Sequence, residues 1–154
     1  MKRTGILLGA ALLVSIVTWY ASPQEFVRFG VLHLIAASTL LLALIPSGSV
    51  INIVIGFLSI ALASFLPSVS QNPVLLPFGI PPPNFMTIDY VPILPWFGVI
   101  VLGRALWPLV PVRLLVNKIY SRRTLTLTWA GRHSLIVYLV HQPVVIGILY
   151  LMKK

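Results

Sequence analysis

The chain has 154 residues, of which 58% are hydrophobic and 8% are charged, and its mean hydropathy is +1.02. This composition excludes an ordinary soluble domain and predicts an integral membrane protein. The absence of cysteine excludes disulfides and thiol chemistry, and we predict no metal site. The net charge of +9 comes from basic residues between apolar runs, so topology and anionic headgroups explain it better than nucleic acid.

Apolar runs of membrane length recur along the chain. They cover residues 5–21, 29–45, 50–66, 91–110 and 133–152. Each is near the length that a tilted helix needs to cross the bilayer, and lipid leaves no other partner for backbone polar groups. The predicted fold is therefore all-α, a polytopic membrane bundle of about five transmembrane helices in one domain over residues 1–154.

The first two runs differ in their polar content. Met1-Lys2-Arg3 resembles the start of a signal peptide, but the bulky Trp19-Tyr20 makes a poor cleavage site, so we predict a retained span. The second run carries His33 one turn inside the interface, followed by small residues that favour close helix contact. We expect His33 on a helix–helix face, and a further role for it stays open.

The middle of the chain contains a small-residue stripe and a proline-rich connection. Gly56, Ser59 and Ala63 are expected to serve helix packing. Residues 67–90 are rich in proline, which predicts a stiff, extended crossing over the membrane surface. Asp89 directly precedes the fourth run, where it either caps that helix or acts as a base or ligand in a site.

Charge predicts the orientation of the chain. Arg104 at the end of the fourth run is expected to snorkel to the interface, with a cavity-facing position as the alternative. The segment 111–132 is basic and suits a short helix in the headgroups, whereas 67–90 contains no Lys or Arg. We therefore place 111–132 and the N-terminus in the cytoplasm and 67–90 outside, in a multi-pass protein of the cell membrane.

The last run carries polar groups near the middle of the bilayer. Helical spacing places Ser134, Tyr138 and His141 on one stripe, and Pro143 is expected to kink the helix. Ionisable groups in hydrocarbon usually face a bundle interior or an aqueous cavity, so this stripe is the best candidate site. The alternative is an inter-helix hydrogen bond with a packing kink, worth roughly 0.6–2 kcal/mol.

Three blocks together resemble a known family. They are Arg28-Phe29-Gly30-Val31-Leu32-His33, then Asp89-Tyr90-Val91-Pro92-Ile93-Leu94-Pro95-Trp96-Phe97-Gly98, then Gly131-Arg132-His133-Ser134-Leu135 followed by Tyr138-Leu139 and His141-Gln142-Pro143. In this order, over nearly the whole chain, they resemble the bacterial and archaeal membrane family grouped with the catalytic domain of heparan-alpha-glucosaminide N-acetyltransferase.

The resemblance implies a multi-span acyltransferase. It would take acetyl from cytosolic acetyl-CoA, its co-substrate, and pass it to a sugar or lipid-linked acceptor on the other side of the membrane. By position, His141 or His33 would be the general base or an acetyl-carrying nucleophile, and Asp89 would orient the acceptor amine.

The resemblance also implies a cytoplasmic mouth that binds the CoA phosphates. Its residues would be Arg132, His133, Ser134, Arg122 and Arg123.

The chain departs from the family at its start. Family members begin with further spans, which carry an acidic-Arg-Gly block and a catalytic His or Asn, whereas this chain starts at what resembles the third family span. We therefore expect the C-terminal part of such an enzyme, and an internal start, a miscalled gene start or a shortened protein are the open explanations. The competing function is a non-catalytic bundle subunit, as a homo-oligomer or with a partner supplying the missing spans, or a small transporter.

Overall fold

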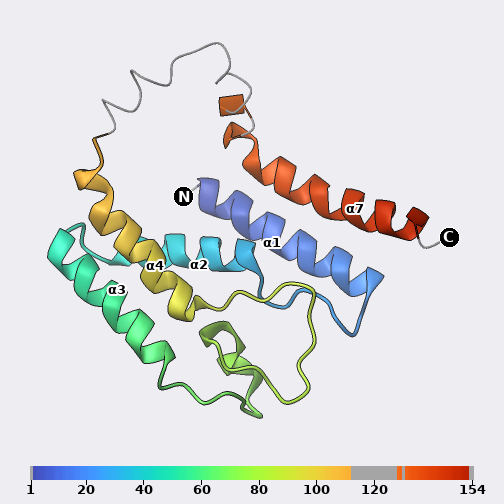
Figure 1. Cartoon of the computed structure of the whole chain (residues 1–154), viewed down its shortest axis with the longest axis horizontal. Coiled ribbons are helices and arrows are strands. Elements are labelled where there is room, and N and C mark those ends of the chain that lie inside the picture. Colours follow the sequence, from blue (N-terminus) through green and yellow to red (C-terminus); the bar gives the residue numbers. More distant parts are fainter. Residues whose placement is uncertain (1, 112–127, 130, 153–154) are drawn as a thin grey trace. The chain divides into compact units, whose positions relative to one another are not determined.

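The computed structural model describes residues 2–111, 128–129 and 131–152, and in these the regular secondary structure is helical (Figure 1). The elements are α1 (Lys2–Ala21), α2 (Val31–Leu44), α3 (Ser49–Ala63), the 3-10 helix η1 (Pro73–Phe78), α4 (Ile93–Leu106), the 3-10 helix η2 (Trp107–Leu109) and α7 (Ser134–Met152). The chain divides into two compact units, Met1–Leu109 and Val110–Lys154, which we describe separately. The predicted all-α class is confirmed, and the single domain stays a prediction.

Each predicted apolar run coincides with an α-helix, but most of these helices are shorter than the runs. Within the described residues, α1 is the one helix long and apolar enough to cross a membrane, whereas α2, α3 and Ile93–Leu109 are shorter apolar helices. Proline explains part of the difference, because Pro46 and Pro92 lie just outside α2 and α4 and disfavour continued helix. The predicted interfacial helix in 111–132 lies almost wholly outside the described residues.

Helix α2 connects the other helices of the first unit and is held at both ends by charged side chains. It packs against α1 and α4, and α4 packs against α3. The Val31 N–H donates to Asp89 Oδ2 at 3.0 Å, and Arg104 Nη1 donates to the carbonyls of Leu42 at 2.9 Å and Ile45 at 3.3 Å. These contacts satisfy end groups that a helix leaves unpaired, and their signs match the helix dipole.

The structure shows which groups these two charged residues contact. Asp89 caps a helix, but the helix is α2 and not α4, whose N-cap is Pro92 without a side-chain hydrogen bond. The guanidinium of Arg104 binds the carbonyls at the end of α2, and its place at the membrane interface stays a prediction. Asp89 is closest in sequence to the start of α4, but the packing of the loops places it at the start of α2.

Helices α3 and α4 lie side by side and approach closely at two glycines (Figure 1). A Cβ added to Gly98 would lie 2.6 Å from the Gly56 carbonyl oxygen, 2.8 Å from Ile60 Cγ1 and 3.1 Å from Ser59 Cβ. The predicted packing role of Gly56 and Ser59 is confirmed, because the missing side chains allow the backbones to meet.

The proline-rich connection is folded, so the prediction of an extended crossing is wrong for its central part. The Asn72 side chain accepts a backbone N–H at the start of η1, and Gly79 ends η1 with a φ of +108°. Leu76 of η1 is buried, and its carbonyl accepts a 2.6 Å hydrogen bond from the Tyr90 hydroxyl. Proline in the first turn and glycine after the last turn are compatible with a short helix, which lets this segment pack inward.

Replacing Gly98 by alanine should destabilise the contact between α3 and α4. The added methyl group meets backbone and branched side-chain atoms, so we expect a loss of about 1–3 kcal/mol in unfolding free energy. Gly103→Ala is the matched control, because a Cβ there meets no atom within 4 Å and removes a helix-interior glycine. Thermal unfolding in detergent measures both variants, and equal melting temperatures would contradict the close approach.

Candidate functional site

Two loops that are distant in sequence run side by side and create the candidate site of the first unit. We call this contact the loop junction: residues 25–31, between α1 and α2, against residues 85–91, before α4. Its hydrogen bonds run from the Ile88 N–H to the Glu25 carbonyl at 2.8 Å, from Thr87 Oγ1 to the Phe26 carbonyl at 2.9 Å, and from the Val91 N–H to the Phe29 carbonyl at 3.0 Å. The junction brings Asp89 to the start of α2, where His33 lies.

His33 lies half-buried in the first turn of α2, and both of its ring nitrogens face polar partners. The Gly30 N–H donates to Nδ1 at 3.3 Å, which is one half of a capping box. Nε2 lies 3.4 Å from Ser15 Oγ, whose hydroxyl donates to the Val27 carbonyl at 2.7 Å. Nδ1 accepts the Gly30 N–H, so this nitrogen carries no proton in the neutral ring. The Ser15 hydroxyl already donates its proton to the Val27 carbonyl, so toward His33 it can only accept. Neutral His33 therefore carries its proton on Nε2 and donates it to Ser15.

Ser15 is a site residue that sequence reasoning missed. It lies on α1, and the neighbouring Thr18 accepts the Val27 N–H at 3.1 Å, so the two hydroxyls bind both backbone groups of a buried residue. The available signal was two hydroxyl residues three positions apart in an apolar run. His33 thus faces α1, and its predicted place on a helix–helix face is confirmed.

Asp89 completes this cluster from the other loop. Its carboxylate accepts the Val31 N–H, and its negative charge acts on the His33 ring. Gly30 makes room for it, because a Cβ there would collide with the Asp89 carboxyl group and lie 2.9 Å from Val27 Cγ1. The structure therefore brings two of the predicted catalytic residues, His33 and Asp89, to one helix end.

The second unit carries the other two histidines, and their rings are held differently. His133 Nδ1 lies 2.9 Å from the Trp129 carbonyl, so it must be the protonated nitrogen, and the two rings are 4.7 Å apart. The exposed His141 ring lies 5.4 Å from the ring of Tyr138, which confirms that these residues share a face of α7. Among the described residues, neither ring nitrogen of His141 has a hydrogen-bond partner.

The remaining predicted site residues lie near the start of α7 or outside the described residues. Arg132, His133 and Ser134 are consecutive at the start of α7, and Arg132 and His133 precede its first residue. Arg122 and Arg123 fall outside the described residues. Within the described part of the chain, no group of three or more His, Cys, Asp or Glu could hold a metal ion.

Apolar helices joined through polar helix ends are the architecture of a membrane-protein domain. A family model described as "Heparan-alpha-glucosaminide N-acetyltransferase, catalytic" matches residues 1–143. The chain belongs to this family of membrane acetyltransferases, whose acetyl donor is acetyl-CoA, and the predicted resemblance is confirmed. Comparisons with curated proteins and with solved structures give no match.

Replacing Asp89 by alanine should loosen the start of α2. The Val31 N–H loses its carboxylate partner, and we expect a loss of roughly 0.5–2 kcal/mol in unfolding free energy, as for other helix caps. Glu25→Gln is the matched control, because it removes the same charge from the same junction. Chemical unfolding in detergent compares the two, and an Asp89→Ala protein as stable as the control would contradict the capping role.

Alkaline pH should weaken the packing of η1 against the segment before α4. Burial raises the pKa of Tyr90, and its neutral hydroxyl donates to the Leu76 carbonyl. A raised pKa in the folded state means that this stabilisation is complete below about pH 10, the ordinary tyrosine value, and is lost as the pH rises through the folded-state value. Hydrogen exchange of 73–80 at increasing pH should show this loss in the wild type, whereas Tyr90→Phe should lack it.

Proposed function

We propose that this chain carries out membrane acetyl transfer, from cytosolic acetyl-CoA to an amine or hydroxyl group of a sugar or lipid-linked acceptor on the outer side. Family membership over residues 1–143 is the observation that carries the proposal, because it supports both the reaction and the donor. The family resemblance supports the acceptor class, the distribution of basic residues supports its side of the membrane, and the described contacts support the residue roles.

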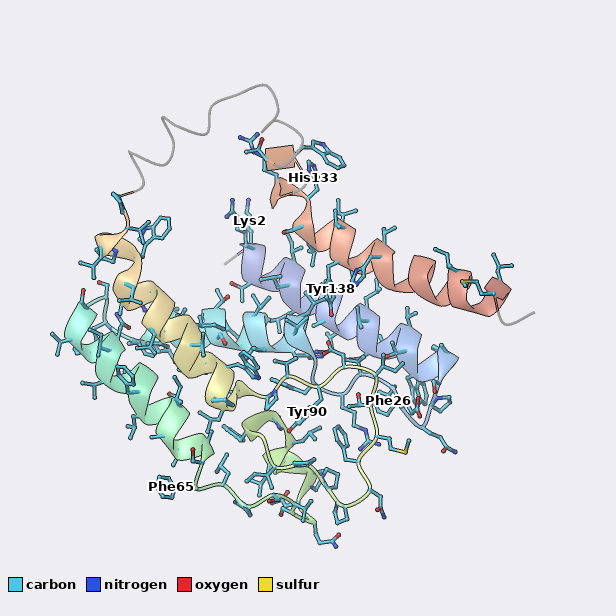
Figure 2. The ribbon with its side chains drawn as sticks, viewed as in Figure 1. Lys2, Phe26, Phe65, Tyr90, His133 and Tyr138 are labelled. Carbon is cyan, nitrogen blue, oxygen red and sulfur yellow. The ribbon has the colours of Figure 1, made fainter. Side chains whose placement is uncertain are left out.

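The exposed surface of the first unit supports a bilayer environment. Large apolar side chains are exposed on its helices; on α1 they include Ile6, Leu12, Leu13, Ile16 and Val17. Phe65, at the end of α3, is 84% exposed and projects from the ribbon (Figure 2). Apolar surface of this extent suits contact with lipid, and we propose that the helices form the five-span bundle with the N-terminus inside.

The capping of α2 also supports this placement. A helix end within or close to hydrocarbon has no water to satisfy its backbone groups, so protein groups must do so. Asp89 and Arg104 satisfy groups at the two ends of α2. A helix shorter than the hydrocarbon thickness can then be accommodated by local thinning of the bilayer.

The reaction requires a group that accepts a proton or an acetyl group. The acceptor nitrogen or oxygen bonds to the acetyl carbon, the carbon–sulfur bond breaks, the acceptor proton passes to a base, and the CoA thiolate takes a proton. We assign the base to His141, because its ring is exposed and neither nitrogen is hydrogen-bonded within the described residues. Alternatively His141 carries the acetyl group itself, which would give ping-pong kinetics.

His33 fits a different role. Its Nδ1 accepts the Gly30 N–H and its Nε2–H points to Ser15, so a neutral ring has no lone pair left for an acceptor proton. We assign His33 and Asp89 to the acceptor side, where the Asp89 carboxylate orients a sugar amine or hydroxyl and His33 holds the start of α2 in place. For His33 to act as the base, its Nδ1 would first have to lose the hydrogen bond from the Gly30 N–H.

The CoA phosphates would bind at the start of α7. The guanidinium of Arg132, two residues before α7, offers two-point hydrogen bonding to a phosphate. His133 and Ser134 lie beside it, and Arg122 and Arg123 are proposed to extend this basic surface.

Replacing His141 by alanine should lower acetyl transfer by about 10²-fold or more, the usual contribution of a general base. The measurement is transfer of labelled acetyl from acetyl-CoA to glucosamine by the purified chain in liposomes. CoA binding should persist in this variant, because the phosphate contacts lie at the start of α7. Val140→Ala is the matched control, an exposed neighbour on the same helix.

Two results would contradict the assignment. Transfer at the wild-type rate by His141→Ala would remove the role of this residue. A wild-type chain that neither binds acetyl-CoA nor acetylates any amino sugar would remove the transferase itself, and would favour a non-catalytic subunit or a transporter.

A further inference from the structure

Arg28 lies at the loop junction with its guanidinium against aromatic rings from both loops. Its Cζ is 5.0 Å from the ring centre of Phe26 and 5.4 Å from that of Phe85. The Phe85 ring in turn meets Tyr90 edge-on at 5.1 Å. The two loops are hydrogen-bonded to each other, so the rings are held at fixed places and define the position of the guanidinium.

Within the described residues, the N–H groups of the Arg28 guanidinium have no hydrogen-bond partner. The guanidinium contacts the rings of Phe26 and Phe85. It forms no hydrogen bond and no ion pair with any other described residue. The side chain is exposed, and the chain contains two acids in all, Glu25 and Asp89. A guanidinium with aromatic groups beside it keeps five N–H donors in its plane, a geometry that suits two-point binding of an oxyanion.

The position of Arg28 is unusual for a basic residue in the proposed orientation. Lys2 and Arg3 lie at the opposite end of α1, and Arg104 binds the far end of α2. Among the described basic residues of the first unit, Arg28 is therefore the one on the proposed outer side. Lys and Arg are normally depleted on that side of a membrane protein. A cation retained there beside the acceptor-side cluster indicates a ligand.

We propose that Arg28 binds an oxyanion of the acceptor, a phosphate, carboxylate or sulfate, beside the cluster of His33 and Asp89. The acceptor would then be an acidic sugar or a sugar linked to lipid through phosphate. Figure 2 shows Phe26 and Tyr90, which lie on the two loops that hold this position. The inference rests on the proposed function for the meaning of the ligand, whereas the binding itself is measured without acetyl transfer.

The test compares two sugars that differ by one anionic group. Wild-type protein in phosphatidylcholine nanodiscs should bind glucosamine 6-phosphate at least about tenfold more tightly than glucosamine, as expected for a charge-assisted, two-point contact. Arg28→Gln should abolish the preference, and Arg28→Lys should keep part of it. Arg3→Gln, which removes an exposed arginine at the other end of α1, is the matched control and should keep it all.

A second arm separates a sugar phosphate from a lipid phosphate. Native mass spectrometry of protein released from mixed phosphatidylglycerol and phosphatidylcholine nanodiscs counts the anionic lipids retained by wild type and Arg28→Gln. Loss of retained phosphatidylglycerol in the variant would identify the source as a headgroup. Loss of the sugar preference would identify it as a soluble or sugar-borne anion, and either result supports the oxyanion site.

The proposal is overturned if Arg28→Gln changes neither the sugar preference nor the retained lipid. If Arg28→Gln fails to fold, the affinity of the wild type for glucosamine 6-phosphate is measured at increasing salt concentration instead. An affinity that does not change with salt would overturn the proposal. Arg28-dependent binding by a protein without acetyl transfer would retain the oxyanion site and remove the transferase. Acetyl transfer that does not depend on Arg28 would do the reverse.

Discussion

The structure of the first unit depends on satisfying the ends of α2. This helix lies between α1 and α4, and its terminal N–H and carbonyl groups have no partners within the helix. Asp89, shortly before α4, and Arg104, in the last turn of α4, supply those partners. The same contacts therefore fix the place of α4, and through the close approach at Gly98 they fix the place of α3. One helix with two charged caps organises the whole unit.

The capping contact has a chemical consequence, because it commits the ring of His33. Its Nδ1 serves the backbone at Gly30 and its Nε2 faces Ser15, whereas His133 uses Nδ1 as a donor and His141 contacts Tyr138 through its ring. The three histidines of the chain thus differ in the lone pairs that they can offer. The proposed roles, His33 as a positioning residue and His141 as the proton acceptor, rest on this difference.

Sequence reasoning located the helices and several polar residues but assigned some contacts to the wrong neighbours. Asp89 was expected to cap the helix that follows it, and the structure gives it to α2 because the loop junction brings distant segments together. Ser15 was not identified, since the spacing of Ser15 and Thr18 in an apolar run does not indicate which backbone groups their hydroxyls bind. The connection around η1 was expected to be extended, because proline content by itself does not indicate which carbonyls find donors.

The all-α class, the positions of the apolar helices, the small-residue contact and the family could all be predicted from the sequence, because they depend on local hydrophobicity, residue size and ordered motifs. The charge that meets each end of α2, the proton position on His33 and the second aromatic ring beside Arg28 required the folded chain. The two charge contacts join residues 58 and 62 positions apart, and the proton on His33 follows from the partner atoms at Gly30 and Ser15.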